Sequence, residues 1–336
     1  MMTSRERIKA IFAGETADQF GFWLGNPHPD MWPILHEYFG TTTEEELRAL
    51  LNDDFRWIRP VEPYKHPEGH AMFDMKRKGV SLSAEGAFAD CEDPAEVDDY
   101  EWPNPDFLDF TETVEYLDQV GDYYRAASFW SPFFHMVCDF FGMENYFIKM
   151  YTHPEVVHAV TQRLVDFYVE ANSRMFEAIG DRGDGMFFGN DFGSQLDLLI
   201  GPDAFREFVF PYFKQLTDVG HAYNKQVILH SCGSIYKVIP DLIELGVDAL
   251  HPLQAKASNM EAGRLASEFK GKVAFMGAVD TQELLPRATP DEVLEEVERL
   301  KKLLGPSLVI SPSHEALLPG MKPENVEAMA RAPRKN

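Results

Sequence analysis

The sequence predicts a (β/α)8 barrel, a fold in which eight parallel strands alternate with helices in a single domain. Short apolar segments alternate with longer amphipathic segments over the 336 residues, which is the pattern of an α/β protein. Eight of the apolar segments have the length of strands, and the chain length suits one barrel with insertions. An open, doubly wound sheet is the alternative, but no glycine-rich dinucleotide loop follows the first strand.

The N-terminal part is expected to contain a helix and the first two strands. Thr3 and Glu6 have the spacing of a capping box, so a first helix should begin here and end near Gly14. The elements expected next are a strand over 20–24, helices over 31–38 and 43–51, and a strand over 53–58.

Residues 60–122 form an insertion between the second and third strands. They contain many Pro, Gly and acidic residues, and we expect loops with β-hairpins over 72–79 and 81–87. A third strand is expected over 123–130.

The second half of the chain alternates regularly between strands and helices. Pro154 opens a long helix that Gly180 ends, because Pro favours the first helical position and Gly the position after the last. A further helix from Pro202 to Gly220 contains Pro211, which can kink it. The remaining strands are expected at 186–188, 227–229, 249–254, 273–277 and 308–310, with helices ending near 246, 269 and 305 and a last one beginning near 323.

The composition limits the classes of partner. The chain has 55 acidic and 31 basic residues, a formal net charge of −24. This field repels nucleic acid and anionic membranes, so neither is an expected partner, and no apolar run is long enough to span a bilayer. The field also repels a polyanionic small molecule unless a local basic pocket offsets it.

The three cysteines are too few for a disulfide framework in a chain of this length. Their number fits a reducing compartment, and the N-terminus has no long apolar signal segment, so we expect a cytoplasmic protein. A homodimer is the general expectation for oligomeric state.

A His and a Cys follow the apolar segment Val227-Ile-Leu229. Because side chains on an extended strand alternate with period 2, His230 and Cys232 should project to the same side. A neutral imidazole and a thiolate are two typical zinc ligands. The alternative is a strand that ends in a hydrogen-bonded His and a small buried Cys, which is common for both residue types.

Further polar residues flank other predicted strands, and the carboxyl ends of barrel strands meet at one mouth. Each residue alone has an ordinary interpretation, such as an N-cap for an Asp, but together they indicate a site. The residues expected there are Asp53 or Asp54, His135, Asp191, Gln195, His230, Cys232, His251, Gln254, Asp280 and His314. His230, Cys232 and His314 would leave a fourth zinc position open, and Asp191 or Glu315 could orient the ligands.

The chain resembles the uroporphyrinogen decarboxylase superfamily from Arg5-Glu-Arg7 nearly to the C-terminus. The segments that carry the resemblance are Asn52-Asp-Asp-Phe55, Asn190-Asp-Phe-Gly-Ser-Gln195, Pro202-Asp-Ala-Phe-Arg-Glu-Phe208, His230-Ser-Cys-Gly233, Asp280-Thr-Gln282 and Leu318-Pro-Gly-Met-Lys-Pro-Glu-Asn-Val326. The resemblance implies the barrel fold. It also implies one of two activities, because the superfamily includes zinc- and corrinoid-dependent methyltransferases beside the decarboxylases.

The methyltransferase branch matches better. Its members carry His-x-Cys at the fifth strand, as His230 and Cys232 do, and usually a Cys where this chain has His314. The third ligand is therefore His314, Glu315 or neither. The decarboxylases instead have an arginine-rich loop after the first strand, whereas this chain has no Arg from Ile8 to Leu47. His314 does match a decarboxylase His before Leu-Pro-Gly, and Asp53 or Asp54 could correspond to their catalytic Asp.

Three hypotheses follow. The first is a zinc-dependent methyltransferase that moves a methyl group between a small methylated donor or a thiol and a corrinoid (cobalamin) on a partner protein, with Asp191 and Gln195 shaping the mouth. The second is a metal-free decarboxylase of a tetrapyrrole or smaller acid that uses Asp54 or Asp53. The third is a barrel that docks a corrinoid protein without chemistry.

The substrate pocket is expected near the mouth. The polar and aromatic residues expected to line it are Trp23, Asn26, His135, His251, Gln254 and Asp280. Aromatic residues could make the pocket suit an aryl ether or a methylamine, although barrel core is the better interpretation for most of them. These aromatic residues are Phe22, Trp23, Trp130, Phe133, Phe134, Phe187 and Phe192.

Overall fold

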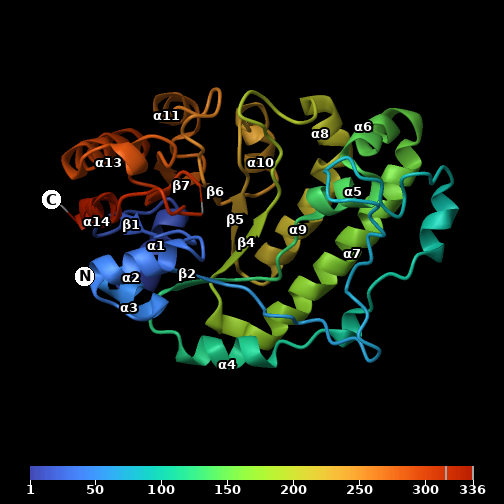
Figure 1. The fold of residues 1–336 in the computed structure, drawn as a ribbon, viewed down its shortest axis with the longest axis horizontal. Helices are drawn as coiled ribbons and strands as arrows, with labels where there is room; N and C mark the ends of the chain where they lie inside the picture. Colours follow the sequence, from blue (N-terminus) through green and yellow to red (C-terminus); the bar gives the residue numbers. More distant parts are fainter. Residues whose placement is uncertain (315, 335–336) are drawn as a thin grey trace.

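The computed structural model describes residues 1–314 and 316–334, and an eight-stranded parallel sheet forms its centre. The strands are β1 (Gly21–Phe22), β2 (Phe55–Ile58), β3 (Tyr124–Ala127), β4 (Gly185–Gly189), β5 (Gln226–His230), β6 (Ala249–His251), β7 (Ala274–Val279) and β8 (Leu308–Pro312). They are ordered β1-β8-β7-β6-β5-β4-β3-β2, and neighbouring strands pair in parallel. The predicted (β/α)8 barrel is confirmed (Figure 1).

Side-chain carboxylates bridge the seam between β1 and β2. The Asp54 backbone N–H donates to the Phe22 carbonyl at 2.9 Å, and the Asp54 carboxylate accepts the Phe22 N–H at 3.0 Å. The Asp53 carboxylate accepts the Leu24 N–H at 3.2 Å. These bonds satisfy backbone groups that a strand ladder would otherwise pair, so the last side of the barrel depends on two aspartates.

The barrel interior is filled with apolar side chains, and helix α1 (Ser4–Phe12) closes its N-terminal end. Ile8, Ile11 and Phe12 of α1 join a buried cluster with Phe55 and Tyr124 of the strands. Burying each of these side chains stabilises the fold by about 1.5–3 kcal/mol. The predicted capping box is present, since the Thr3 hydroxyl accepts from the Glu6 N–H and the Glu6 carboxylate accepts from the Thr3 N–H.

Helices surround the strands and follow the predicted alternation (Figure 1). After α1 they are α2 (Met31–Phe39), α3 (Glu44–Leu50), α4 (Thr111–Gln119), α5 (Phe133–Phe141), α6 (Met143–Thr152), α7 (Pro154–Ile179), α8 (Pro202–Phe208), α9 (Phe210–Ala222), α10 (Ile239–Glu244), α11 (Ala262–Phe269), α12 (Leu284–Arg287), α13 (Pro290–Leu304) and α14 (Pro323–Arg331). None of the helices in residues 1–314 and 316–334 is both long and apolar enough to cross a membrane.

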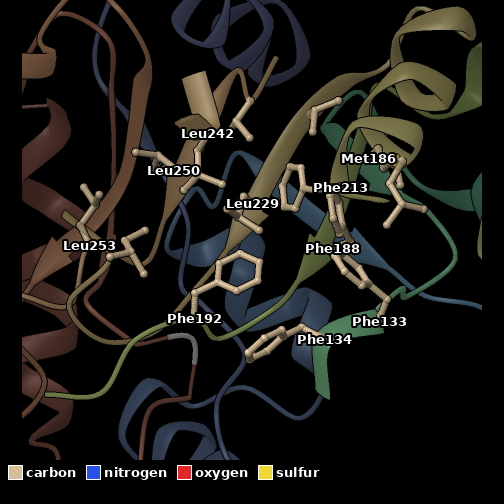
Figure 2. Packing of buried hydrophobic residues seen from close by; sticks show 14 of the residues in the cluster. Phe133, Phe134, Met186, Phe188, Phe192, Phe213, Leu229, Leu242, Leu250 and Leu253 are labelled. Carbon is tan, nitrogen blue, oxygen red and sulfur yellow. The ribbon is translucent and has the colours of Figure 1, made fainter. Parts of the chain in front are cut away.

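A second apolar core lies between the strands and the outer helices. Figure 2 shows Phe188 of β4 against Phe213 of α9, and their ring centroids lie 5.1 Å apart. Phe192, which follows β4, lies 5.4 Å from Phe134 of α5. This packing holds the loop after β4 against the helices, and that loop carries one of the site residues described below.

Two helical regions differ from the sequence prediction. The helix expected from Pro202 to Gly220 is divided into α8 and α9 at Val209, because Pro211 near the start of α9 lacks the N–H that would continue α8. Helices α5 and α6 were not predicted. Five phenylalanines and tyrosines of α5 and α6 are fully buried, and a short aromatic and apolar segment of this kind cannot be assigned to a helix or a strand by periodicity alone.

The insertion 60–122 contains no strand, so the β-hairpins expected over 72–79 and 81–87 are wrong. The segment consists of loops, two short 3-10 helices (Pro94–Asp99 and Pro105–Phe107) and α4, with one antiparallel bridge between Tyr64 and Leu108. Much of it lies along α7 (Figure 1). Its hydrophobic residues pack against α7 and α5 rather than against a partner strand.

Candidate functional site

Three potential metal ligands converge where β4 and β5 end. His230 is the last residue of β5, Cys232 lies two residues further on, and Asp191 lies two residues after β4. The His230 Nε2 atom lies 3.4 Å from the Cys232 Sγ atom and 3.6 Å from the Asp191 Oδ1 atom. All three ligand atoms lie within 4.8 Å of one another. We call Asp191, His230 and Cys232 the ligand group.

The two loops that carry the ligand group are joined through their backbones. The Asp191 Oδ1 atom accepts the Cys232 N–H at 2.7 Å, and the Ser194 carbonyl accepts the Ser234 N–H at 2.7 Å. Gly233 has φ +82°, and a Cβ atom there would lie 2.4 Å from the Gly193 carbonyl. Only glycine permits this approach, so the His-x-Cys-Gly sequence places Cys232 beside Asp191.

A buried histidine orients the ring of His230. The Nδ1 atoms of His230 and His251 lie 2.9 Å apart, and His251, at the end of β6, is 1% exposed. Burial holds the pKa of His251 well below its ordinary value, and the nearby His230 and His314 lower it further. A neutral His251 can accept the Nδ1 proton of His230, which leaves the His230 Nε2 atom unprotonated toward Cys232 and Asp191. His251 therefore supports the ligand group from behind rather than lining a pocket.

His135 of α5 lies on the outer side of the ligand group. Its Nε2 atom is 3.7 Å from the Asp191 Oδ2 atom, and its side chain is 43% exposed. Burial lowers the pKa of His135, while the charge of Asp191 opposes this effect. A neutral, accessible imidazole thus stands beside the carboxylate, as expected for a residue at the mouth.

The ligand group fits a zinc ion. A tetrahedral zinc with its nitrogen ligand at about 2.0 Å and its sulfur ligand at about 2.3 Å holds these two atoms about 3.5 Å apart. The observed 3.4 Å between His230 Nε2 and Cys232 Sγ matches this spacing. Imidazole, thiolate and carboxylate are all zinc ligands, and three protein ligands leave a fourth position open.

His314 was expected as the third ligand, but its ring nitrogens do not join the ligand group. Its Nδ1 atom accepts the Ala316 N–H at 3.1 Å. It lies close enough to His251 to lower the pKa of that residue, so it is near the mouth. Among the described residues Asp191, and not His314, lies with His230 and Cys232, and Glu315, the other candidate, lies outside the described residues.

Asp54 lies at the opposite end of the barrel, which corrects its expected position at the mouth. It directly precedes β2, is 1% exposed, and accepts hydrogen bonds from Ser4 Oγ at 2.7 Å and Arg7 at 2.6 Å. Asp53 lies at the same end and pairs with Arg48 at 2.7 Å. Both carboxylates are used in closing the barrel.

The other expected pocket residues have mixed positions. Asp280 follows β7, but its carboxylate caps α12 by accepting the N–H groups of Gln282, Glu283 and Leu284. The Gln254 Oε1 atom accepts the Gly233 N–H at 2.7 Å, so Gln254 holds the loop of the ligand group.

Three further residues complete the expected set. Trp23 is buried in the barrel, with its ring centroid 5.1 Å from that of His251. Asn26 and Gln195 are exposed. Of the expected residues, the structure thus brings His135 and His251 into contact with the ligand group and leaves the other pocket residues in supporting, core or surface positions.

A cavity of about 1010 Å³ lies beside the mouth, and of its lining only Trp130 was among the aromatic residues expected to line a pocket. Trp57 and Arg59 at the end of β2, and Phe129 and Trp130 after β3, line one side of it, and the insertion lines the other. The available sequence signal was position, because Arg59 directly follows a strand, where active-site residues of barrels are found.

Comparisons with known proteins agree with the fold. The model of the family described as uroporphyrinogen decarboxylase (URO-D) matches residues 75–335. A solved methyltransferase structure from Methanosarcina mazei covers 99% of this chain and 98% of its own, with a TM-score of 0.72 and 17% identity. A candidate vitamin-B12 independent methionine synthase from Listeria monocytogenes covers 94% of this chain and 95% of its own, with a TM-score of 0.45 and 12% identity. No curated protein matches the sequence.

Proposed function

The chain belongs to the uroporphyrinogen decarboxylase family, and we propose that within it the protein is a zinc-dependent methyltransferase. The observation that carries the proposal is the convergence of Asp191, His230 and Cys232, whose ligand atoms lie within 4.8 Å of one another, with His230 Nε2 and Cys232 Sγ at the spacing of two zinc ligands. The similarity in fold to the Methanosarcina methyltransferase is consistent with it. A zinc ion bound there would act as a Lewis acid that keeps a thiol substrate as thiolate or activates a methyl donor.

The protein groups have separable roles in this proposal. Asp191, His230 and Cys232 hold the ion, and His251 fixes the orientation of the His230 ring through the 2.9 Å contact between their Nδ1 atoms. His135, neutral and partly exposed beside Asp191, is placed to accept the proton that an entering thiol loses.

We propose further that the other methyl-carrying partner is a corrinoid on a separate protein. The support is the resemblance of the His230-x-Cys232 pair to the corrinoid-dependent branch of the superfamily. The metal-free decarboxylase hypothesis receives no support from the structure, because Asp53 and Asp54 are buried in ion pairs at the other end of the barrel. A docking barrel without chemistry would give no reason for the ligand group at the mouth.

Elemental analysis of the purified protein tests the proposal. We expect about one zinc per chain, which Cys232→Ala should abolish because a thiolate ligand is lost. Cys91→Ala is the matched control, since Cys91 is buried in the insertion and belongs to no ligand group among residues 1–314 and 316–334.

The chemical test is the visible spectrum of reduced cobalamin mixed with the protein and a methylated donor. Conversion to methylcobalamin should require zinc and fail in Cys232→Ala. Full methyl transfer after chelator treatment, or equal zinc in the Cys232→Ala and Cys91→Ala variants, would contradict the proposed function.

A further inference from the structure

Arg59 is a cation without a carboxylate partner at the cavity beside the ligand group. Within the described part of the chain, the guanidinium of Arg59 forms no ion pair or hydrogen bond. Its Cζ atom lies over the Trp57 ring, 4.3 Å from the ring centroid. Desolvation alone lowers its pKa. In contrast, Arg7, Arg48 and Arg56 each pair with a carboxylate within 2.7 Å.

The surrounding charges make this arrangement unusual. The chain has 55 acidic residues against 31 basic ones, so an arginine finds a carboxylate easily. Glu62 lines the same cavity without pairing with Arg59, and His70, also in the wall, contacts Glu101 at 3.4 Å and Glu68 at 3.6 Å. Among the described residues, none of these acids pairs with Arg59, so its guanidinium is available to a ligand.

The cavity wall is largely aromatic and apolar. Besides Arg59 and Trp57, it includes Phe129, Trp130, Met136 and Tyr168. Large flat rings with few polar atoms favour a planar apolar ligand, which can stack on them. A volume of about 1010 Å³ is ample for a single aromatic ring with substituents.

A continuous series of rings joins Arg59 to the ligand group. The Trp57 and Trp130 ring centroids lie 5.2 Å apart, and the Trp130 and His230 centroids lie 6.4 Å apart. Gly189 at the end of β4 permits this packing, because a Cβ atom there would lie 2.4 Å from the Trp130 ring. Trp130 is thus the wall that the cavity shares with the ligand group, and Arg59 stands at the far end of the series.

We propose that this cavity binds an aromatic carboxylate, with the carboxylate on Arg59 and the ring against Trp57 and Trp130. A guanidinium binds a carboxylate through paired N–H donors, and no other side chain lining the cavity offers a comparable positive charge. The inference rests on the proposed function in one respect, since it names the methyl donor as an anionic aryl methyl ether rather than a cationic methylamine.

A set of three matched ligands tests the proposal on the full-length protein. The probes are para-methoxybenzoate, para-methoxybenzamide and para-methoxybenzylamine, which share a ring and a methoxy group but are anionic, neutral and cationic. Binding is followed by tryptophan fluorescence, because Trp57 and Trp130 line the cavity. We expect the carboxylate to bind about tenfold more tightly than the amide, and the amine to bind least.

Variants assign the difference to one residue. Arg59→Gln should lower the affinity for para-methoxybenzoate about tenfold and leave the affinity for para-methoxybenzamide unchanged. The affinity of Arg59→Lys for para-methoxybenzoate should lie between those of the wild type and Arg59→Gln. Arg264→Gln is the matched control, because Arg264 also lies over an aromatic ring, 4.2 Å from the Tyr236 centroid, but outside the cavity. It should bind like the wild type.

Repeating the titrations after chelator treatment separates this inference from the proposed function. Persistent preference for the carboxylate supports the Arg59 site whatever the zinc content. The inference is overturned if no probe binds, if the three probes bind alike, if Arg59→Gln weakens carboxylate and amide equally, or if the preference disappears with the metal. Failure of zinc binding with an intact preference would overturn only the proposed function.

Discussion

Both ends of the barrel carry acidic residues, but the two ends use them differently. At the N-terminal end, Asp54, Asp184 and Asp248 directly precede β2, β4 and β6. Each accepts a backbone N–H from the strand before, at 3.0, 3.1 and 2.7 Å, respectively. Each also contacts a cationic or protonatable side chain, namely Arg7, Arg5 and His221. Strands β2, β4 and β6 are thus each tied to the preceding strand by the same arrangement.

At the C-terminal end, Asp191 contacts only His135 and His230 among the described ion pairs, with no Arg or Lys. It is 35% exposed and shares its surroundings with a thiol. The comparison teaches that the partners of an acid, more than its position, separate structural from chemical acids, since Asp280 also follows a strand but caps α12. Carboxylates saturated by arginine and backbone stabilise the fold, whereas a carboxylate beside imidazole and thiol can still accept a metal ion.

The largest effect is expected where the N-terminal arrangement is broken. Asp54→Ala should lower the free energy of unfolding by about 2–3 kcal/mol, because it leaves the buried Arg7 with only the partly exposed Asp18 as an ion-pair partner and the Phe22 N–H without an acceptor. Denaturant unfolding measures the loss. Asp203→Ala, at a fully exposed ion pair, should cost about 0.5 kcal/mol or less. Equal losses in the two variants would remove the distinction between the ends.

Asp191→Asn is expected to change stability little and zinc affinity strongly. Its amide oxygen can still accept the Cys232 N–H, so the free energy of unfolding of the metal-free protein should change by less than about 1 kcal/mol. Zinc affinity should fall at least about 100-fold, because a charged ligand is lost. A competition titration with a chromophoric chelator measures this. Unchanged affinity would exclude Asp191 from the ligand group and favour a ligand that we have not described.

A smaller effect on zinc is expected behind the ligand group. His251→Leu removes the acceptor for the His230 Nδ1 proton and should weaken zinc about tenfold. His251→Asn offers an amide oxygen in a similar position and should recover part of the affinity. If both variants bind zinc as the wild type does, the contact between the two imidazoles has no role in orienting His230.

The smallest effect concerns pH at the N-terminal end. The hydrogen bond to Asp248 raises the pKa of His221, so the folded state holds this proton more tightly than the unfolded state. The pair therefore stabilises the fold below about pH 6.5 and loses its effect as pH rises through the folded-state pKa. His221→Asn should cost about 0.5 kcal/mol or less at pH 5.5 and less at pH 8.5, because the ring is 41% exposed. A larger loss at pH 8.5 would contradict this linkage.

The sequence predicted the barrel from the alternation of apolar and amphipathic segments, and the pair of His230 and Cys232 from their spacing of two residues at a strand end. It did not place Asp54 correctly. Asp54 lies before a strand of four residues, and a shift of a few positions exchanges one end of the barrel for the other. Asp191 in place of His314, and the cavity between β2, β3 and the insertion, depend on how separate loops pack. The hydrophobic periodicity of the sequence does not indicate how these loops pack together.

Helix α1 also determines from which end of the barrel substrates reach the ligand group. Helix α1 closes the barrel at the end opposite the ligand group, with Ile8, Ile11 and Phe12 packed into the interior. Reactants therefore reach the ligand group from the C-terminal mouth rather than through the N-terminal end. Under the proposed reaction, a corrinoid carrier protein bound over this mouth would block access to the ligand group. The small methyl donor therefore has to bind before the carrier protein. The fold therefore favours ordered rather than random binding of the donor and the carrier protein.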